Sequence, residues 1–273
     1  MDDLSDIASY YNSDPAREHT RLERHQLEYE LTWRYLDRFL PPRGTILEVG
    51  AATGRYTLEL ARRGYRVTAV DLSAELLETC RQNIRRAGLE EQVNLVVADA
   101  RDLGQVRESD FDAALIMGPL YHLIRADDRS VALEQVYERL KPGGIVVSAF
   151  ISRFGILGDL MRDVPAWIED REDVRSLLAS GQRPEGAPRG GFRGYFASVA
   201  EITPLHEAAG FETLVLAGSE PAISADDESY NRLEGTQRQL WLDLLYEVST
   251  EKSTLAASRH LLYIVRKPAE ARL

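Results

Sequence analysis

The sequence predicts an α/β protein with a doubly wound, mostly parallel sheet of seven strands. From about residue 45, short β-branched runs alternate with helical patterns, which is typical of strand–helix–strand units. Breaks that contain glycine or proline separate these units. The chain has 273 residues, of which 44% are hydrophobic and 28% are charged, so it can bury a large core and is not a disordered chain.

Each predicted strand is a short apolar run bounded by residues that break regular structure. The first run follows Pro41-Pro42-Arg43-Gly44, and the fifth follows Lys141-Pro142-Gly143-Gly144. Helical patterns follow the first, second and fourth of these runs, so we expect the first five strands to be parallel. The seven predicted strands are residues 45–49, 66–70, 93–98, 112–117, 145–150, 211–216 and 259–266.

The predicted helices have capping residues at the expected ends. Gly64 and Gly88 end helices over residues 53–63 and 73–87, since glycine adopts the left-handed conformation of a C-terminal cap. Ser73 is the expected N-terminal cap of the second of these helices. Further helices are predicted over residues 17–40, 128–140 and 230–248.

The charge balance of the chain is acidic. It has 33 basic and 44 acidic residues, a net charge of −11, and no Lys/Arg run longer than two. Because nucleic-acid affinity depends on neutralising phosphates, we expect a small-molecule substrate, no nucleic-acid partner and no membrane partner. The acidic start and the lack of a long apolar run predict neither a signal peptide nor a membrane span. With Cys80 as the single cysteine, we expect a soluble cytoplasmic monomer or homodimer.

A turn of small residues follows the first predicted strand. Gly50 and Gly54 enclose Ala51 and Ala52, so a ligand can approach the backbone closely, and the next helix offers free N–H groups. A dinucleotide fingerprint needs G-x-G-x-x-G, whereas here the two glycines are four residues apart with Ala52 between them. A glycine-rich turn without a ligand is the alternative interpretation.

Three acidic residues lie near the carboxyl ends of consecutive predicted strands. Glu48 belongs to the first strand, and Asp71 and Asp99 close the second and third. Open α/β sheets bind ligands at this edge, where a carboxylate can accept hydrogen bonds from ribose hydroxyls. Such an acidic ring repels phosphates and attracts a cationic, phosphate-free nucleoside. We therefore expect Asp71, Asp99 and Gly50 to share one hollow; helix capping is the alternative role for the two aspartates.

The run Glu48-Val49-Gly50-Ala51-Ala52-Thr53-Gly54 resembles the E/D-x-G-x-G-x-G motif of class I S-adenosylmethionine (SAM)-dependent methyltransferases. Residues 67–73, 98–100 and 140–144 resemble the next three landmarks of that family in order. The resemblance is firm over about residues 40–150 and looser in the C-terminal part, and Ala52 replaces the middle glycine. It implies SAM as the cofactor and a Rossmann-like sheet whose last strand is antiparallel.

The resemblance also implies roles for individual residues. Glu48 would orient the glycine loop and the amino group of SAM, Asp71 would bind the ribose, and Asp99 with Ala100 would read the adenine. Tyr11 would fold over the cofactor as a lid, although an ordinary core contact is an equal alternative. The predicted cofactor-binding residues are Tyr11, Glu48, Gly50, Ala51, Gly54, Asp71, Leu72, Asp99, Ala100 and Met117.

Residues 117–123 follow the fourth strand, where the family places groups next to the transferred methyl group. His122 is the candidate catalytic base, because a neutral imidazole accepts a proton near pH 7; lining the pocket without proton transfer is the alternative. Tyr121 is a candidate substrate contact. The segment lacks the Asn/Asp-Pro-Pro-aromatic sequence of methyltransferases that modify base amines, which argues further against a nucleic-acid substrate.

We expect one methyltransferase domain over residues 1–273. Its predicted parts are an N-terminal helical lid (1–40), a SAM-binding core (41–150), a substrate cap inserted after the fifth strand (151–197) and the C-terminal part of the sheet (198–273). The cap is expected to contact substrate through some of Arg153, Phe154, Trp167, Tyr195 and Phe196. No His/Cys spacing fits zinc, so we predict no metal.

The predicted function is SAM-dependent transfer of a methyl group to an oxygen, nitrogen or carbon atom of a small metabolite. Two alternatives stay open. The chain could bind SAM for a regulatory role or a non-transfer reaction such as cyclisation, or it could be an NAD-dependent oxidoreductase. The glycine spacing counts against the oxidoreductase.

Overall fold

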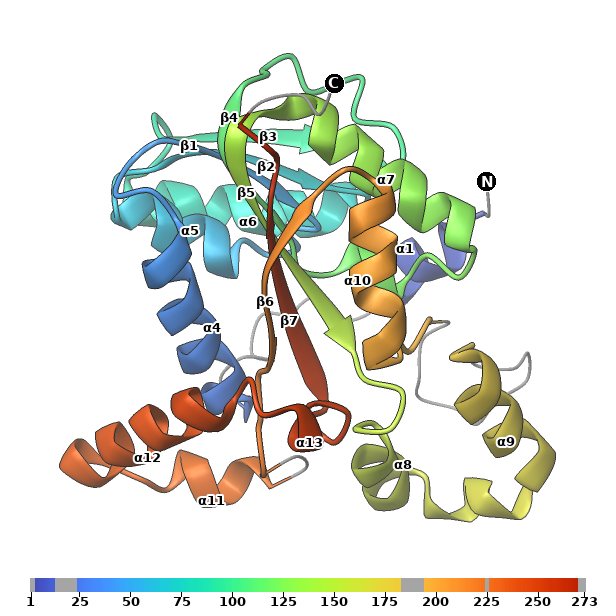
Figure 1. The fold of residues 1–273 in the computed structure, drawn as a ribbon. Helices are drawn as coiled ribbons and strands as arrows, with labels where there is room; N and C mark the ends of the chain where they lie inside the picture. The colour runs from blue at the N-terminus through green and yellow to red at the C-terminus, as the bar shows by residue number, and fades with distance from the viewer. Residues whose placement is uncertain (1–2, 13–23, 183–193, 224–225, 270–273) are drawn as a thin grey trace.

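The computed structural model describes residues 3–12, 24–182, 194–223 and 226–269. In this part of the chain, seven strands form one sheet in the order β3-β2-β1-β4-β5-β7-β6 (Figure 1). β7 (His260–Arg266) is antiparallel to both of its neighbours, and the remaining neighbouring strands are parallel. The predicted seven-stranded, mostly parallel sheet with an antiparallel last strand is therefore confirmed.

The strand order reverses between β1 and β4, and this reversal positions the site. The chain moves outward from β1 through β2 to β3, then returns to the other side of β1 to form β4 and β5. Ligands bind in the crevice that such a reversal opens at the carboxyl ends of the strands. The strands are β1 (Thr45–Val49), β2 (Arg66–Asp71), β3 (Val93–Val97), β4 (Phe111–Ile116), β5 (Leu140–Ile151) and β6 (Glu212–Gly218).

Helices cover both faces of the sheet because alternate strand residues are buried on opposite sides. In β4, Ala113 and Leu115 pack into one core and Ala114 and Ile116 into the other. The first core includes side chains of α4 (Gln26–Phe39), α5 (Arg55–Arg62), α6 (Ala74–Ala87) and α12 (Gly235–Val248), and the second those of α7 (Ala126–Arg139) and α10 (Val199–Ala208). Figure 1 shows α4 and α5 on one side of the sheet and α7 and α10 on the other.

The predicted caps are present in the structure. Ser73 Oγ accepts a hydrogen bond from Leu76 N at 3.0 Å, which satisfies an N–H of the first turn of α6. Gly64 and Gly88 have positive φ angles of 91° and 67°, as the sequence predicts for glycines that end helices. These local signals fix the lengths of α5 and α6.

The helical parts outside the core differ from the prediction. A short helix, α1 (Ser5–Asn12), precedes the expected N-terminal helix, which is described only as α4; residues 17–23 of the predicted helix lie outside the described residues. The cap contains α8 (Leu157–Asp163), η2 (Pro165–Glu169) and α9 (Arg171–Ser180).

The C-terminal helices also differ from the prediction. The helix predicted at 230–248 is two helices, α11 (Asp227–Asn231) and α12, because Gly235 at the start of α12 has a φ angle of 50°. The remaining elements are η1 (Pro119–Tyr121) and α13 (Lys252–Leu255).

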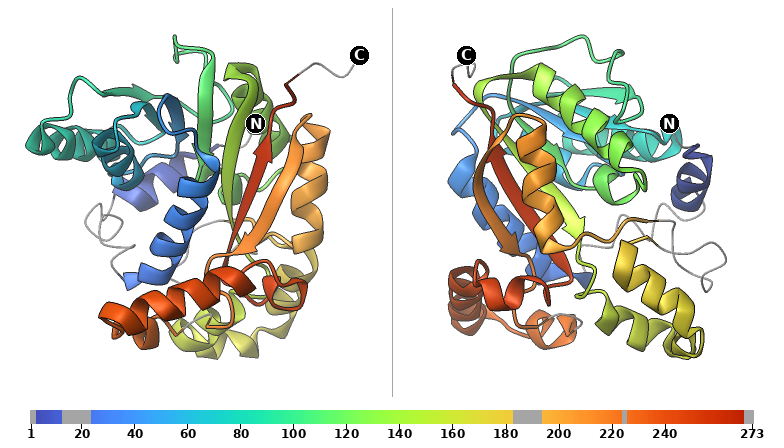
Figure 2. Two further views of the ribbon diagram at one scale, coloured as in Figure 1. Left: turned by 60° about the vertical axis from the view of Figure 1, so that its left-hand side comes forward. Right: turned by 45° about the vertical axis from the view of Figure 1, so that its right-hand side comes forward.

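Arg259, just before β7, joins the elements beyond the C-terminal end of β5. Its side chain is 2% exposed and donates to Glu220, to Asp227, the first residue of α11, and to Asp159 of α8, at 2.8, 3.0 and 3.2 Å. Figure 2 shows α8–α9 and α11–α12 below the sheet, where this network lies. The contact explains how the cap and the C-terminal helices are held to one rim.

Three side chains near this network have possible metal-ligand atoms that lie close together. His260 Nδ1 lies 2.8 Å from Glu220 Oε1 and 3.5 Å from a carboxylate oxygen of Glu28. Arg259 donates to the same Glu220 oxygen, so a cation already occupies this carboxylate. We interpret the group as an ion-paired cluster. None of the described helices is long and apolar enough to cross a bilayer.

Candidate active site

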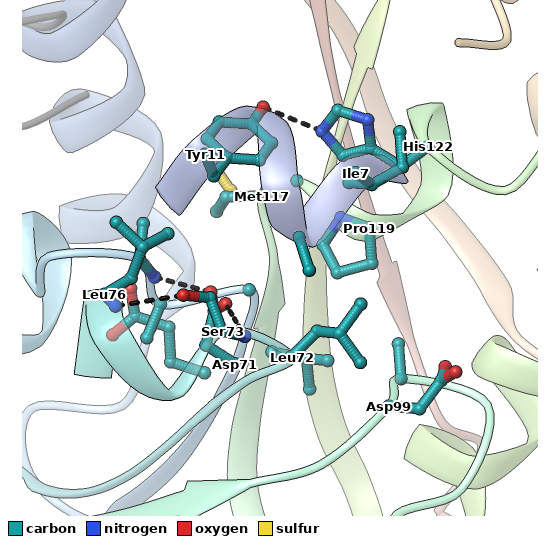
Figure 3. A pocket seen from close by; sticks show the side chains of 18 of the residues that line it. Ile7, Tyr11, Asp71, Leu72, Ser73, Leu76, Asp99, Met117, Pro119 and His122 are labelled. Carbon is teal, nitrogen blue, oxygen red and sulfur yellow. Dashed lines mark hydrogen bonds between the residues drawn. The ribbon is translucent and has the colours of Figure 1, made fainter. Parts of the chain in front are cut away.

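One cavity of about 1060 Å³, its open mouth included, lies at the carboxyl ends of β1, β2 and β4. Its walls come from α1, the β1–α5 turn, the end of β2 with the start of α6, the segment after β3 and the segment after β4 (Figure 3). Asp71, Asp99 and Gly50 all line it, as the sequence predicts. All ten residues predicted to bind the cofactor contribute to its lining except Gly54, which lies directly beside it in the turn.

The β1–α5 turn needs glycine at two positions. Gly50 has a φ angle of 83°, and a Cβ atom there would lie 2.6 Å from Cδ of Pro119, on the opposite wall. Gly54 has a φ angle of 85°, and a Cβ atom there would collide with Sγ of Cys80. The turn is held by Val70 O, which accepts from Gly50 N at 2.8 Å and from Ala51 N at 2.9 Å. Larger residues would therefore move this wall of the cavity.

Asp71 holds the turn and still has acceptor capacity. Its Oδ2 accepts from Ala52 N at 2.8 Å, and its Oδ1 accepts from Ser73 N at 2.9 Å. Burial raises the pKa of Asp71, although these backbone hydrogen bonds lower it in part. Because a carboxylate has about four acceptor sites, the remaining ones can receive the hydroxyls of a ribose.

Asp99 is held by an arginine that the sequence analysis did not single out. Arg101 Nε donates to Asp99 Oδ1 at 3.0 Å and Arg101 Nη2 donates to Oδ2 at 2.6 Å. The third nitrogen, Nη1, donates to Asp128 of α7 at 2.8 Å. Figure 3 shows Leu72 between Asp71 and Asp99, in position to pack against a planar ring.

Glu48 is the most deeply buried acid of the cavity wall. Its side chain is buried and accepts from Thr57 Oγ1 at 2.6 Å. Burial raises the pKa of Glu48 to about 8, and the hydrogen bond from Thr57 offsets only part of that rise. The carboxyl group is therefore mostly protonated at neutral pH in the protein alone.

Helix α1 forms a roof over the cavity. The Tyr11 hydroxyl lies 2.8 Å from His122 Nε2, so α1 reaches the segment after β4 (Figure 3). At the next residue, Asn12 Nδ2 donates to Glu75 at 2.9 Å, and Asn12 Oδ1 accepts from Ser73 Oγ at 2.6 Å, which attaches α1 to the start of α6. Tyr11 thus lines the cavity and contacts His122 directly, and its role as a lid over the cofactor stays a prediction.

The predicted substrate contacts divide between the cavity and the cap. Tyr121 and His122 line the cavity, whereas Arg153, Phe154 and Tyr195 do not. Arg153 is 5% exposed and donates to both carboxylate oxygens of Glu201, and Phe154 is 46% exposed on the surface.

Tyr195 also donates its hydroxyl to Glu201, and its backbone N–H donates to Tyr121 O at 2.8 Å. Trp167 and Phe196 belong to a separate apolar cluster under the cap. Among the described residues, the cap therefore contacts the segment around Tyr121 through this backbone hydrogen bond.

The lining suits a cationic nucleoside without a phosphate. Glycine at position 50 allows close backbone approach, Asp71 offers acceptors for a diol, and Leu72 offers an apolar face next to Asp99. Among the described residues of the lining, three are acidic and one, Arg55, is an arginine or lysine.

Comparison with known proteins also indicates a site for SAM, a cationic nucleoside. Residues 46–144 match a family model described as a methyltransferase domain. A SAM-dependent methyltransferase of Methanosarcina mazei has a similar structure, with a TM-score of 0.60 and 20% identity over 86% of this chain and 98% of that one. Residues 46–144 are therefore a methyltransferase domain of the SAM-dependent type. SAM is the cofactor that this family and fold imply, in place of NAD.

Two curated relatives match the methyltransferase domain at the sequence level. The tRNA 5-carboxymethoxyuridine methyltransferase of Escherichia coli K12 is 29% identical over 136 residues, which are 48% of this chain and 51% of that protein. The carboxy-S-adenosyl-L-methionine synthase of Shewanella loihica is 31% identical over 117 residues, 41% of this chain and 46% of that one. The chain thus spans about half the length of the curated relatives it matches.

The tRNA enzyme corrects one prediction. The acidic net charge and the missing base-amine motif were the reasons to exclude a nucleic-acid partner, and a relative that modifies tRNA overturns that exclusion. The physical reason is that net charge is a property of the whole surface, whereas phosphate binding depends on the charge of one face. A small-molecule substrate is therefore not established for this methyltransferase domain.

Sequence reasoning missed several residues of the cavity. Arg55 in the lining and Arg101, which holds Asp99 without lining the cavity itself, carry no local signal because arginine is frequent throughout the chain. Leu4, Ile7 and Ala8 line the cavity beside the predicted Tyr11, and the i, i+3, i+4, i+7 spacing of these four residues is the pattern of one helix face. That spacing was the available signal for the roof.

Proposed function

We propose that the chain transfers the methyl group of SAM to a nucleophilic atom of an acceptor that binds beside Tyr121 and His122. One observation carries the proposal: a single cavity joins the glycine turn and the three acidic strand ends to a roof that contacts His122 through Tyr11. A nucleoside at the strand ends would point its far end toward that contact.

The residues of the chain would hold SAM by complementary groups. Asp71 would accept from the ribose hydroxyls, Asp99 would hold the adenine amine, and Leu72 would pack on the adenine ring. Glu48 lies under the glycine turn, where the amino group would be. SAM supplies an electrophilic methyl group on a sulfonium, so the main task of the protein is to align donor and acceptor and to exclude water, which can contribute several kcal/mol, up to roughly 7–11.

His122 is the group proposed to take the proton of the acceptor. In the protein alone its Nε2 faces the Tyr11 hydroxyl, so an acceptor hydroxyl or amine reaches this nitrogen by taking the place of Tyr11. Tyr121, next in sequence, lines the same end of the cavity and is proposed to contact the acceptor.

The acceptor class is left to experiment. The sequence analysis favoured a small metabolite, but the tRNA-modifying relative supports testing RNA on equal terms. Cytoplasmic location likewise stays a prediction from sequence. Oxygen, nitrogen and carbon acceptors are all compatible with a base at His122.

The decisive experiment is transfer from methyl-labelled SAM to two acceptor pools, total tRNA and an RNA-free metabolite extract. Label in either pool together with S-adenosylhomocysteine supports the proposal and identifies the acceptor class. We expect Asp71→Ala and Gly50→Asp to abolish both SAM binding and transfer, while Glu78→Ala on the exposed face of α6 retains them. SAM binding without S-adenosylhomocysteine in either pool would favour a regulatory or non-transfer role, and SAM binding unaffected by Asp71→Ala and Gly50→Asp would reject the site.

A further inference from the structure

We infer that Arg55 binds the carboxylate of the methionine part of SAM and thereby selects SAM over analogues without that group. The inference rests on the proposed function, because it assigns a role within the same cavity. No sequence motif suggested it; it follows from the charges and contacts of the lining.

Arg55 is the only arginine or lysine among the described residues that line the cavity. It is the first residue of α5 and follows Gly54 directly, so its side chain starts at the end of the glycine turn. The methionine part of SAM is assigned to this turn. The N–H groups of the first turn of α5 add a favourable field for an anion at this end of the helix.

The charges of the cavity require a cation at this end. SAM carries two positive groups, the sulfonium and the ammonium, and one negative group, the carboxylate. The Asp71 carboxylate favours the positive groups but disfavours a carboxylate placed near the turn. Asp99 is already paired with Arg101, so Arg101 is not available to a second carboxylate there.

The guanidinium of Arg55 is positioned by an aromatic side chain. Its Cζ atom lies 5.1 Å from the ring centroid of Tyr29 on α4, within the range of a cation–π contact. Tyr29 in turn lies 5.7 Å, centroid to centroid, from Tyr56, which also lines the cavity. A guanidinium held in this way loses little freedom when it binds a carboxylate.

A carboxylate on the acceptor is the competing explanation for Arg55. The acceptor residues Tyr121 and His122 follow β4, whereas Arg55 follows β1 and the glycine turn. The two sets belong to different walls of the cavity. The position of Arg55 therefore favours the cofactor.

The test compares SAM with decarboxylated SAM, which keeps the sulfonium and the amine but lacks the carboxylate. Dissociation constants are measured by calorimetry for the wild type, Arg55→Gln and the matched control Arg62→Gln, an exposed arginine at the other end of α5. We expect wild type and Arg62→Gln to prefer SAM by about 10- to 100-fold, as for a hydrogen bond to a charged group. Arg55→Gln should bind SAM that much more weakly and bind decarboxylated SAM within about twofold of wild type.

Retained binding of decarboxylated SAM also shows that Arg55→Gln is folded. Equal weakening of both ligands would mean that Arg55 only supports Tyr29, and unchanged SAM binding would mean that it has no role; either result overturns the inference. A variant with normal SAM affinity but a raised KM for the acceptor would assign Arg55 to the acceptor instead. If wild type binds neither ligand, the proposed function itself is wrong.

Discussion

Arg101 holds both carboxylate oxygens of Asp99 and, through its remaining nitrogen, the carboxylate of Asp128. Asp128 lies in the first turn of α7, a few residues after His122. One buried guanidinium therefore links Asp99, proposed to face the adenine, to the helix that follows the proposed acceptor segment.

Replacing Arg101 should affect stability and cofactor binding together. Arg101→Gln leaves the Asp128 side chain, which is 4% exposed, without its cation, so the free energy of unfolding should fall by about 3–5 kcal/mol. SAM affinity should fall roughly tenfold because Asp99 loses its orientation. Urea unfolding and calorimetry measure the two effects. Arg81→Gln, which breaks an exposed pair with Glu78, should change stability by less than about 0.5 kcal/mol; equal effects of the two variants would contradict the prediction.

Glu48 should make the protein less stable as the pH rises. Its pKa is raised from 4.5 in the unfolded chain to about 8 in the folded protein, so between these values the folded state binds more protons. Stability from this group is complete below pH 4.5 and is lost as the pH rises through about 8. The slope is at most about 1.4 kcal/mol per pH unit.

Glu48→Gln isolates that contribution, since the amide cannot titrate. Unfolding free energies measured from pH 5 to pH 8.5 should fall more steeply for wild type than for Glu48→Gln. Parallel curves for the two proteins would show that Glu48 is ionised when folded.

Gly50 and Gly64 form a matched pair for testing the glycine turn. Both have positive φ angles, 83° and 91°, but a Cβ atom at position 50 would press on Pro119, whereas nothing lies within 4 Å of one at position 64. Gly64→Ala should cost about 1–2 kcal/mol for the backbone alone, and Gly50→Ala should cost about 1–3 kcal/mol more. Only Gly50→Ala should weaken SAM binding. Similar losses in both variants would place the strain in the backbone and not at the contact with Pro119.

Substitutions of His122 and Tyr11 should have different effects, the first on catalysis and the second on closure of the roof by α1. His122→Asn should lower kcat by about 100-fold or more and leave the SAM dissociation constant within about threefold, since it removes a base. Tyr11→Phe should mainly weaken SAM binding, by about 3- to 10-fold, because it removes one hydrogen bond that closes the roof. Single-turnover rates and calorimetry distinguish the two. If Tyr11→Phe lowers kcat as far as His122→Asn does, the proton passes through Tyr11 and the proposed placement of the acceptor is wrong.

The strands and turns of the core could be predicted because their signals are local. Strand β1 has the predicted limits at Thr45 and Val49, since a buried parallel strand is a continuous apolar run between breakers. The conformations of Gly50 and Ser73 follow from the residue types themselves. The acidic strand ends share one cavity because the order of a doubly wound sheet places them at one edge.

The cap and the roof could not be derived in this way because they depend on distant partners. Arg153 was expected to contact substrate, but Glu201, 48 residues later, takes its guanidinium, and no local pattern announces that pairing. Helix α1 has only eight residues, too few to be stable alone, so its place depends on contacts such as Tyr11 with His122.

The attachment of α1 at both ends of the cavity has a consequence for the rate of turnover. A nucleoside bound under this helix would lie beneath the hydrogen bonds of Tyr11 to His122 and of Asn12 to Ser73 and Glu75, so we expect these bonds to break before it is released. We therefore expect departure of the spent cofactor, and not bond formation, to limit steady-state velocity, with a first turnover faster than those that follow.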